Sequence, residues 1–171
     1  MDAPYDEMAP QTLPLRPIGI IHSQHCDPAR TPIQPVCAAG CCGRVEVFEE
    51  YADGLVDIEG FSHLHLLYWL HRAAPASLMV VPYLEDVCHG VFATRTPTRP
   101  NPLGLSVVRL VERRGRMLFV EDVDVLDGTP VLDIKPYVER FDVRLGTRGG
   151  WTDGVDAETF FRRGTRGRQE G

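Results

Sequence analysis

Alternating apolar and polar residues recur in short stretches along the chain, and this period of two predicts β-strands. The clearest stretch is 63–71, where Leu64, Leu66, Tyr68 and Leu70 would share one face of a central strand. Histidines and larger apolar residues would occupy its other face. Further strands are predicted at 17–22, 44–48, 78–81, 91–94, 105–112, 117–126 and 131–137.

Proline and glycine separate these stretches, since the chain has 14 prolines and 16 glycines. Residues 25–43 and 94–104 are predicted as loops because their prolines exclude regular structure. The segment 51–59 is predicted as a turn or a short helix, and residues 114–116 as the turn of a hairpin. Gly128 would adopt a positive φ in the tight turn that follows this hairpin.

Many short strands without a long segment of period 3.6 predict a mainly β fold, either a barrel or a sandwich. No Gly-x-Gly-x-x-Gly motif follows a strand and strands do not alternate with helices, which disfavours a Rossmann-type fold. The 171 residues suffice for one domain with a hydrophobic core. We expect this domain at 17–142, after a disordered, proline-rich leader at 1–16 and before an arginine-rich tail at 143–171.

Neither a membrane span nor an export signal is predicted. The longest apolar run, 64–70, is interrupted by His65 and is far too short to cross a bilayer. The first residues are acidic and rich in proline, whereas a signal peptide needs a basic start and an apolar stretch. The five cysteines are an odd number, which suits a reducing compartment better than a disulfide framework. We therefore expect a cytoplasmic protein without membrane association.

The net charge of −6 argues against nonspecific binding of nucleic acid. The charge is unevenly distributed, however, because arginines gather at 90–116 and again from residue 140 onward. Both zones could contact phosphates. The alternative is a solvated exterior on which basic and acidic surfaces balance, and charge alone favours that alternative.

Residues 90–104 form an unusual loop that holds Arg95, Arg99 and Asn101 between three prolines. A stiff loop loses less conformational entropy when it binds a ligand. Each guanidinium presents a planar set of donors that fits a carboxylate, a phosphate or the edge of a base. The alternative is a surface turn with solvated arginines, and composition alone does not separate the two.

Two neighbouring predicted strands carry alternating polar residues. Asp122 and Asp124 would share one strand face about 7 Å apart. On the next strand, Asp133, Lys135 and Tyr137 would share a face. This pattern suggests a polar site, although a solvated outer face with a weak Asp–Lys pair is the more common structure for it.

Cysteine and histidine side chains raise the question of a metal site. Thiolates and imidazoles suit zinc, but their spacings here match no familiar zinc finger. We therefore predict no metal and assign these side chains to packing or to the surface. They are His25, Cys26, Cys37, Cys41, Cys42, His63 and His65. A Ser-His-Asp arrangement and a phosphate-binding Walker loop are also missing from the sequence.

Several of these stretches match one protein family in sequence and in order. They are Pro17-Ile-Gly-Ile-Ile-His-Ser23, Gly60-Phe-Ser-His63, His71-Arg72, Gly90-Val-Phe-Ala-Thr-Arg95, Arg99-Pro-Asn-Pro-Leu-Gly-Leu-Ser106 and Leu126-Asp-Gly-Thr-Pro-Val-Leu-Asp-Ile-Lys-Pro-Tyr137. With these motifs the chain resembles the TrmO (TsaA-like) family of S-adenosylmethionine-dependent tRNA methyltransferases over residues 15–142.

This resemblance implies a small antiparallel β-barrel with short helices and long proline-rich loops, which works as a homodimer. It implies S-adenosylmethionine as the cofactor, bound near the subunit interface, and tRNA as the partner. The implied reaction is N6-methylation of threonylcarbamoyladenosine beside the anticodon. By motif position, the cofactor contacts would be Gln34, Pro35, Val36, Cys37, His71, Arg72, Arg95, Leu105, Glu121, Asp122, Val123 and Asp124. Substrate binding would involve Arg99 and Asn101, and catalysis Asp133, Lys135 and Tyr137.

Two departures from the family pattern bear on the methyl acceptor. The early loop reads Pro32-Ile-Gln-Pro35, where tRNA-methylating members usually carry an arginine. In place of the longer C-terminal domain that helps such members to hold tRNA, a tail begins near Val143. The alternatives are methylation of another RNA or a small metabolite, a non-catalytic S-adenosylmethionine-binding module, and a cysteine-based metal or redox protein.

Overall fold

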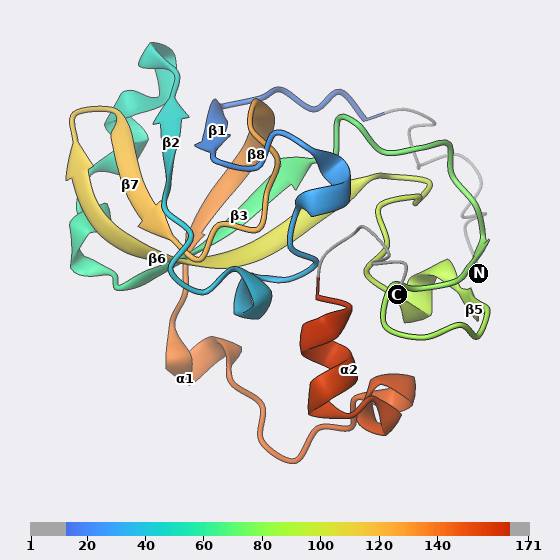
Figure 1. The fold of residues 1–171 in the computed structure, drawn as a ribbon. Coiled ribbons are helices and arrows are strands. Elements are labelled where there is room, and N and C mark those ends of the chain that lie inside the picture. Colours follow the sequence, from blue (N-terminus) through green and yellow to red (C-terminus); the bar gives the residue numbers. More distant parts are fainter. Residues whose placement is uncertain (1–12, 165–171) are drawn as a thin grey trace, which may run out of the picture.

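Within residues 13–164, which the computed structural model describes, six antiparallel strands form a closed barrel (Figure 1). The strands follow the order β1-β2-β7-β6-β3-β8, and β8 pairs with β1 to close the barrel. Their bounds are β1 (Gly19–Ser23), β2 (Gly43–Val47), β3 (His63–Trp69), β6 (Leu103–Arg114), β7 (Met117–Glu121) and β8 (Thr129–Pro136). The predicted small antiparallel β-barrel is confirmed.

Shorter elements connect the strands, as the spacing of proline and glycine predicts. β4 (Met79–Val80) and β5 (His89–Gly90) pair as a separate small sheet. The helices are η2 (Pro28–Arg30), η3 (Pro35–Ala38), η4 (Glu49–Leu55), η5 (Ile58–Gly60), η6 (Val91–Ala93), α1 (Glu139–Asp142), η7 (Gly150–Gly154) and α2 (Ala157–Arg162), where η marks a 3-10 helix. The helical turns η4 and η5 confirm the prediction for 51–59.

The alternation within β2 and β3 explains the packed interior of the barrel. Leu64, Leu66 and Tyr68 of β3 point inward and are at most 3% exposed. Val45 and Val47 of β2 are buried in the same core. Burial of an aliphatic side chain of this size contributes about 1.5–3 kcal/mol. The faces predicted for these residues are confirmed.

The prediction of a strand at 91–94 is wrong, because Val91–Ala93 forms the helical turn η6. The amide and the hydroxyl of Thr94 both donate to the carbonyl of Val91, at 3.1 and 2.9 Å. A threonine side chain that bonds to the backbone in this way competes with pairing in a sheet. The β-branched residues at this position therefore gave a misleading strand signal.

The strand predicted at 117–126 ends at Glu121, so Asp122 and Asp124 do not share a strand face. Asp122 has a φ of 66°, in the left-handed region, and this conformation ends the strand. Its Oδ1 accepts a hydrogen bond from the amide of Gly40 at 2.8 Å. The loop before β2 thus holds the chain after β7, and no local pattern encodes such a contact.

An irregularity in the pairing of β3 with β8 decides which residues of β8 face the core. The register shifts between Leu67 and Tyr68, whose partners are Asp133 and Val131. Val131, which precedes the register shift along β8, is fully buried. Ile134, which follows the shift, also packs against the core. Asp133 therefore lies on the outer surface, opposite an outward-facing residue of β3.

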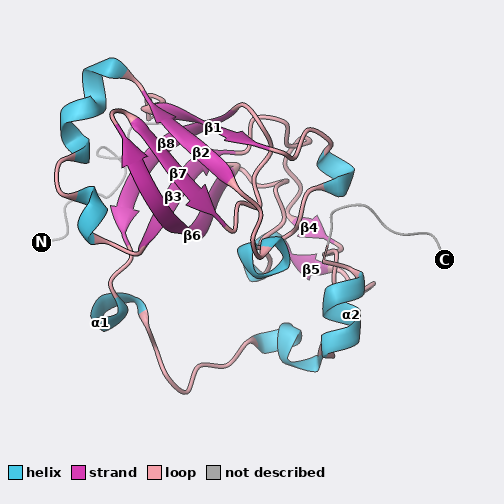
Figure 2. Cartoon of the chain, turned by 60° about the vertical axis from the view of Figure 1, so that its left-hand side comes forward, coloured by secondary structure: helices cyan, strands magenta, loops and turns pink. Residues whose placement is uncertain are grey.

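Past the barrel, the chain turns through α1 and runs through η7 to α2, which lies on the side of β4 and β5 (Figures 1 and 2). Trp151 Nε1–H donates to the carbonyl of Ala93 at 2.7 Å, and Arg163 forms an ion pair with Asp86 at 3.0 Å. These contacts attach the segment to the rest of the fold. It is therefore in position to contribute side chains to a site.

The expectations for the two ends of the chain fall in part on residues 1–12 and 165–171, which lie outside the described residues. Residues 13–16, from the predicted leader, are exposed and have no regular structure. In the described part of the chain, no helix is long and apolar enough to cross a membrane.

Candidate functional site

A cavity of about 1000 Å³ lies where the barrel meets the C-terminal segment. Its walls come from the loops at 33–34, 82–84 and 92–99, from 103–105 at the start of β6, and from residues within 149–161. This volume is at the upper end of the range of roughly 300–1,000 Å³ that is usual for small-molecule and cofactor sites. The cavity is therefore large enough for a cofactor.

The base of this cavity contains a chain of buried hydrogen bonds. The hydroxyl oxygens of Tyr68 and Ser106 lie 2.9 Å apart, and Ser106 Oγ donates to Asp124 Oδ1 at 2.5 Å. All three residues are at most 3% exposed, and Tyr68 and Asp124 line the cavity. A buried carboxylate needs such hydrogen bonds because its transfer from water is costly. Its negative charge also favours a ligand that carries positive charge.

The absence of a side chain at Gly104 leaves space for the ring of Tyr68 at the cavity. The two residues pair across β6 and β3, and a Cβ atom at position 104 would lie 2.0 Å from Tyr68 Cε2. Glycine inside a strand often marks such a close approach. Here it lets the tyrosine hydroxyl extend to Ser106.

Gly104→Ala is expected to displace Tyr68 and to lower stability, because overpacking of a core typically costs about 1–3 kcal/mol. Thermal unfolding followed by circular dichroism measures the change as a lower Tm. Gly54→Ala is the matched control, since a Cβ atom at that position meets nothing within 4 Å. An unchanged Tm for Gly104→Ala would contradict the position of the tyrosine ring.

Two arginines stand at the rim of the large cavity. Arg95 is exposed, and its Nη1 donates to Gln34 Oε1 at 2.6 Å. Arg99 is half-buried, and its Nη1 donates to two backbone carbonyls of the loop 91–94, at 3.1 and 2.8 Å. Arg99 is thus held by its own loop, whereas the guanidinium of Arg95 is accessible to an anionic group of a ligand.

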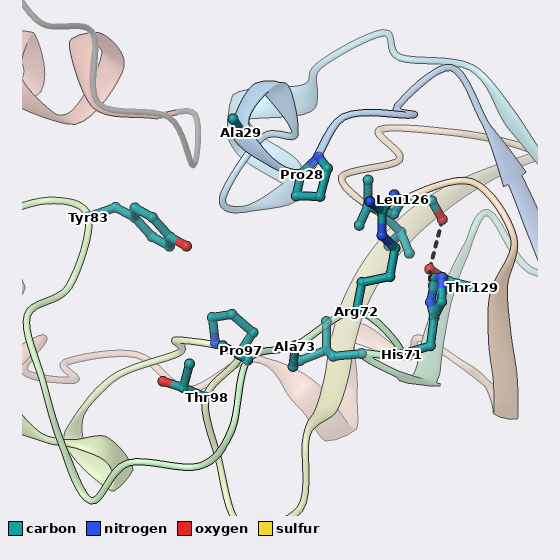
Figure 3. A pocket seen from close by; sticks show the side chains of 13 residues that line it. Pro28, Ala29, His71, Arg72, Ala73, Tyr83, Pro97, Thr98, Leu126 and Thr129 are labelled. Atoms are coloured by element: carbon teal, nitrogen blue, oxygen red, sulfur yellow. Dashed lines mark hydrogen bonds between the residues drawn. The ribbon is translucent and has the colours of Figure 1, made fainter.

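A smaller cavity of about 250 Å³ adjoins the first and shares lining residues with it, among them Tyr83. Figure 3 shows Tyr83 on one side of this cavity and His71, Arg72 and Thr129 on the other. Thr129 Oγ1 lies 3.3 Å from His71 Nδ1, and Arg72 Nη1 donates to the carbonyl of Cys26 at 3.3 Å. These contacts hold the His71-Arg72 motif beside the larger cavity.

Two titratable groups near the cavities have shifted pKa values. Partial burial, and then the positive charge of Arg72, lower the pKa of the His71 imidazole. Burial, and then the negative charge of Asp124, raise the pKa of the Cys37 thiol. At neutral pH both groups are therefore uncharged. Cys37 lacks the thiolate character of a nucleophile.

The predicted cofactor contacts divide between the two cavities and their surroundings. The large cavity is lined by Gln34, Arg95, Leu105 and Asp124, and the small one by His71 and Arg72. Neither of these cavities is lined by Pro35, Val36, Cys37, Glu121, Asp122 or Val123. The predicted substrate residue Arg99 lines the large cavity, and Asn101 lines neither. The contacts of all these residues with a ligand stay predictions.

Asp133, Lys135 and Tyr137 lie outside both cavities. Lys135 Nζ is 2.7 Å from Asp133 Oδ2, and the two side chains are 63% and 42% exposed. The ring of Tyr137 packs against the imidazoles of His63 and His65, with centroid distances of 6.2 and 5.4 Å. The three predicted catalytic residues therefore share the outer face of the barrel with two histidines.

The strand register connects this outer face to the large cavity. Asp133 pairs with Leu67 of β3, and Leu67 pairs with Leu105 of β6. Two strand spacings, about 10 Å, therefore separate Asp133 from Leu105, which lines the cavity. A substrate that extends from the cavity over Leu105 could reach the Asp133–Lys135 pair.

Reasoning from the sequence missed the lining residues of the C-terminal segment. Trp151, Phe160 and Phe161 line the large cavity, although the sequence pattern predicts only an arginine-rich tail at 143–171. A signal was available, because a tail that is merely solvated has no need of large aromatic residues. Their partners on the barrel side could not be read from the sequence.

In residues 13–164, no group of three or more His, Cys, Asp or Glu side chains is placed to hold a metal ion. His25 Nε2 is 2.9 Å from the carbonyl of Val123, and Cys41 Sγ accepts a hydrogen bond from Gln24 at 3.1 Å. These candidate metal ligands thus have partners in the surrounding structure.

Together, these features define a small closed β-barrel with a cofactor-sized cavity that is lined by two arginines. The family model described as the tRNA-methyltransferase O N-terminal domain matches residues 20–143. This match covers most of the chain, and the chain belongs to the TrmO family.

Relatives and solved structures agree with this membership. A Pyrococcus abyssi protein named "Probable S-adenosyl-L-methionine-binding protein" is 59% identical over 138 residues, which cover 81% of this chain and 75% of that protein. The human tRNA (adenine(37)-N6)-methyltransferase is 35% identical over 133 residues, which cover 74% of this chain and 30% of that protein. One crystal structure of TrmO from Pseudomonas aeruginosa has a TM-score of 0.71 and 39% identity, covering 86% of this chain and 64% of that one. The chain thus matches only part of the last two proteins.

Proposed function

We propose that the chain transfers the methyl group of S-adenosylmethionine to N6 of threonylcarbamoyladenosine in tRNA. The observation that carries this proposal is the large cavity, on which Gln34, Arg95 and Asp124 converge from separate loops. Membership of the TrmO family supports it, as do the names of relatives that bind S-adenosylmethionine or methylate tRNA adenine. The partner is then tRNA, and we place the reaction in the cytoplasm.

The cavity fits S-adenosylmethionine in size and in chemistry. A volume of about 1000 Å³ leaves room for a nucleoside cofactor and part of an acceptor. The guanidinium of Arg95 suits the carboxylate of the methionine part, and the carboxylate of Asp124 suits the positively charged sulfur. His71 and Arg72 extend the site into the smaller cavity. The bound cofactor supplies a methyl group on a sulfonium, which is an activated donor.

The residues of this chain then have mainly a positioning task, because the nucleophile must approach in line with the bond that breaks. The N–H of a carbamoylated adenine is urea-like and more acidic than a plain exocyclic amine, so a carboxylate suffices as base. Asp133 accepts this proton. Lys135, whose Nζ is 2.7 Å from Asp133 Oδ2, stabilises the charge that develops on the adjacent carbonyl. Arg99 and Asn101 bind the tRNA beside the cavity.

The chain works as a homodimer in this proposal. Support comes from the outer face of β3 and β6, where Trp69, Leu103 and Leu105 are 38%, 39% and 58% exposed. Exposed apolar side chains that lie together mark a surface suited to a protein partner. A second copy on this face would cover the apolar side chains beside Asp133. Sedimentation velocity measures the oligomeric state directly.

Analysis of tRNA nucleosides by mass spectrometry tests the proposed reaction. The purified chain is incubated with S-adenosylmethionine and tRNA that carries threonylcarbamoyladenosine. We expect a modified nucleoside in which one methyl group has replaced a hydrogen, so that its mass rises by that of CH2. The same tRNA without the threonylcarbamoyl group is the control and should stay unmethylated. Absence of methylated product from a chain that binds the cofactor would refute this acceptor.

A second candidate function is binding of S-adenosylmethionine without methyl transfer. The observation that favours it is the position of Asp133 and Lys135 outside both cavities. Such a module would bind the cofactor in calorimetry but leave tRNA, other RNA and small metabolites unmethylated. The two candidates therefore differ in a single measurement, the loss of the methyl group from the cofactor.

A further inference from the structure

The C-terminal segment supplies an aromatic wall to the large cavity. Trp151, Phe160 and Phe161 form this wall. All three lie after residue 143, where the match to the family model ends. The polar residues expected to hold the cofactor all lie before that residue. The segment after the family domain therefore adds three aromatic side chains to a cavity whose expected cofactor-binding residues all come from that domain.

Trp151 is held in one orientation on the aromatic side. Its Nε1–H donates to the carbonyl of Ala93 at 2.7 Å. Its ring stacks on the imidazole of His89, with centroids 5.1 Å apart and planes inclined by 19°. His89 is in turn paired with Glu85. The indole is half-buried and lines the cavity, so a preorganised aromatic surface borders the open space.

The far end of α2 is attached independently of Trp151. Arg163 contacts both carboxylate oxygens of Asp86, at 3.3 and 3.0 Å. The amide of Ile33 donates to the carbonyl of Gly164 at 2.9 Å, next to Gln34 at the cavity rim. The segment is thus attached both at Trp151 and at the end of α2. Its position as a wall of the cavity therefore does not depend on one contact alone.

We infer that Trp151 is the stacking platform for the acceptor base, a planar purine, in this chain. Base–aromatic stacking is the common device for binding an unpaired base of RNA, and arginines nearby suit the flanking phosphates. Arg99, which the proposed function assigns to tRNA binding, lines the same cavity as Trp151. The inference rests on the proposed function, because it assigns to Trp151 the base that receives the methyl group.

Fluorescence and binding measurements test this assignment. The probe is an RNA stem-loop with threonylcarbamoyladenosine in its loop, compared with the same stem-loop carrying an abasic site there. Only the first RNA should quench tryptophan fluorescence. Trp151→Phe should abolish this quenching, because Trp69 is the other tryptophan of the chain and lies on the outer face. Trp151→Ala should weaken RNA binding roughly tenfold, and Trp151→Phe should restore most of the affinity.

Binding of S-adenosylmethionine, measured by calorimetry, should be unchanged in both variants. Asp86→Asn is the control for attachment of the segment, and it should bind the RNA as the unmodified chain does. The inference is overturned if Trp151→Ala binds the RNA with normal affinity, or if it lowers the affinity for S-adenosylmethionine as much as the affinity for RNA. It is also overturned if Asp86→Asn lowers the affinity for RNA to the same extent. Failure of the proposed function has a different signature, because the unmodified chain would then bind no cofactor or methylate no tRNA.

Discussion

Lys135→Ala is expected to slow methyl transfer about 100- to 1000-fold, the loss that is usual when one donor to a developing charge is removed. Lys135 is the lone lysine of the chain, and its Nζ is 2.7 Å from Asp133 Oδ2 on the outer face of the barrel. The affinity for S-adenosylmethionine should not change, because Lys135 lies outside both cavities. Single-turnover kinetics with saturating cofactor and tRNA measure the chemical step directly.

Arg44→Ala is the matched control, since it removes an exposed positive charge from β2, which β1 separates from β8 and which pairs with neither β8 nor β3. It should leave the single-turnover rate unchanged. Calorimetry on Lys135→Ala checks that the cofactor still binds. A normal single-turnover rate for Lys135→Ala would remove this residue from the mechanism and would assign stabilisation of the developing charge to another group.

Asp124→Asn is expected to weaken binding of S-adenosylmethionine by about 2 kcal/mol, or roughly 30-fold, because the buried partner of a cationic ligand loses its charge. The asparagine retains an oxygen that can accept the hydrogen bond from Ser106. The product S-adenosylhomocysteine carries a neutral sulfur, so its affinity should change much less. The ratio of the two dissociation constants, measured by calorimetry, is therefore the diagnostic quantity.

Asp127→Asn serves as the control for this experiment. Asp127 is exposed, accepts a hydrogen bond from the amide of Ser23 at 3.0 Å, and lines neither cavity. This substitution makes the same chemical change three residues along the chain. It should leave the affinities for S-adenosylmethionine and S-adenosylhomocysteine unchanged. If Asp124→Asn lowered the affinities for S-adenosylmethionine and S-adenosylhomocysteine equally, Asp124 would shape the cavity without recognising the charge on the sulfur.

The sequence by itself determined the strands whose pattern is strictly local. The alternation at Leu64, Leu66 and Tyr68 predicted both β3 and its buried face, because a period of two assigns alternate side chains to opposite faces. Gly128, with a φ of 75°, takes the conformation expected of its turn. The resemblance carried by the motifs also identified the family, since residue types in a fixed order do not require a folded chain to be recognised.

Only the tertiary structure decided where the polar groups face. Asp122 ends β7 through a bond to Gly40, and the register shift beside Leu67 turns Asp133 to the outer surface. Trp151 becomes a wall of the cavity through contacts with residues about sixty positions earlier in the chain. These features depend on pairs of residues that are distant in sequence. Local propensity and spacing carry no information about which of the many possible long-range contacts the packed barrel selects.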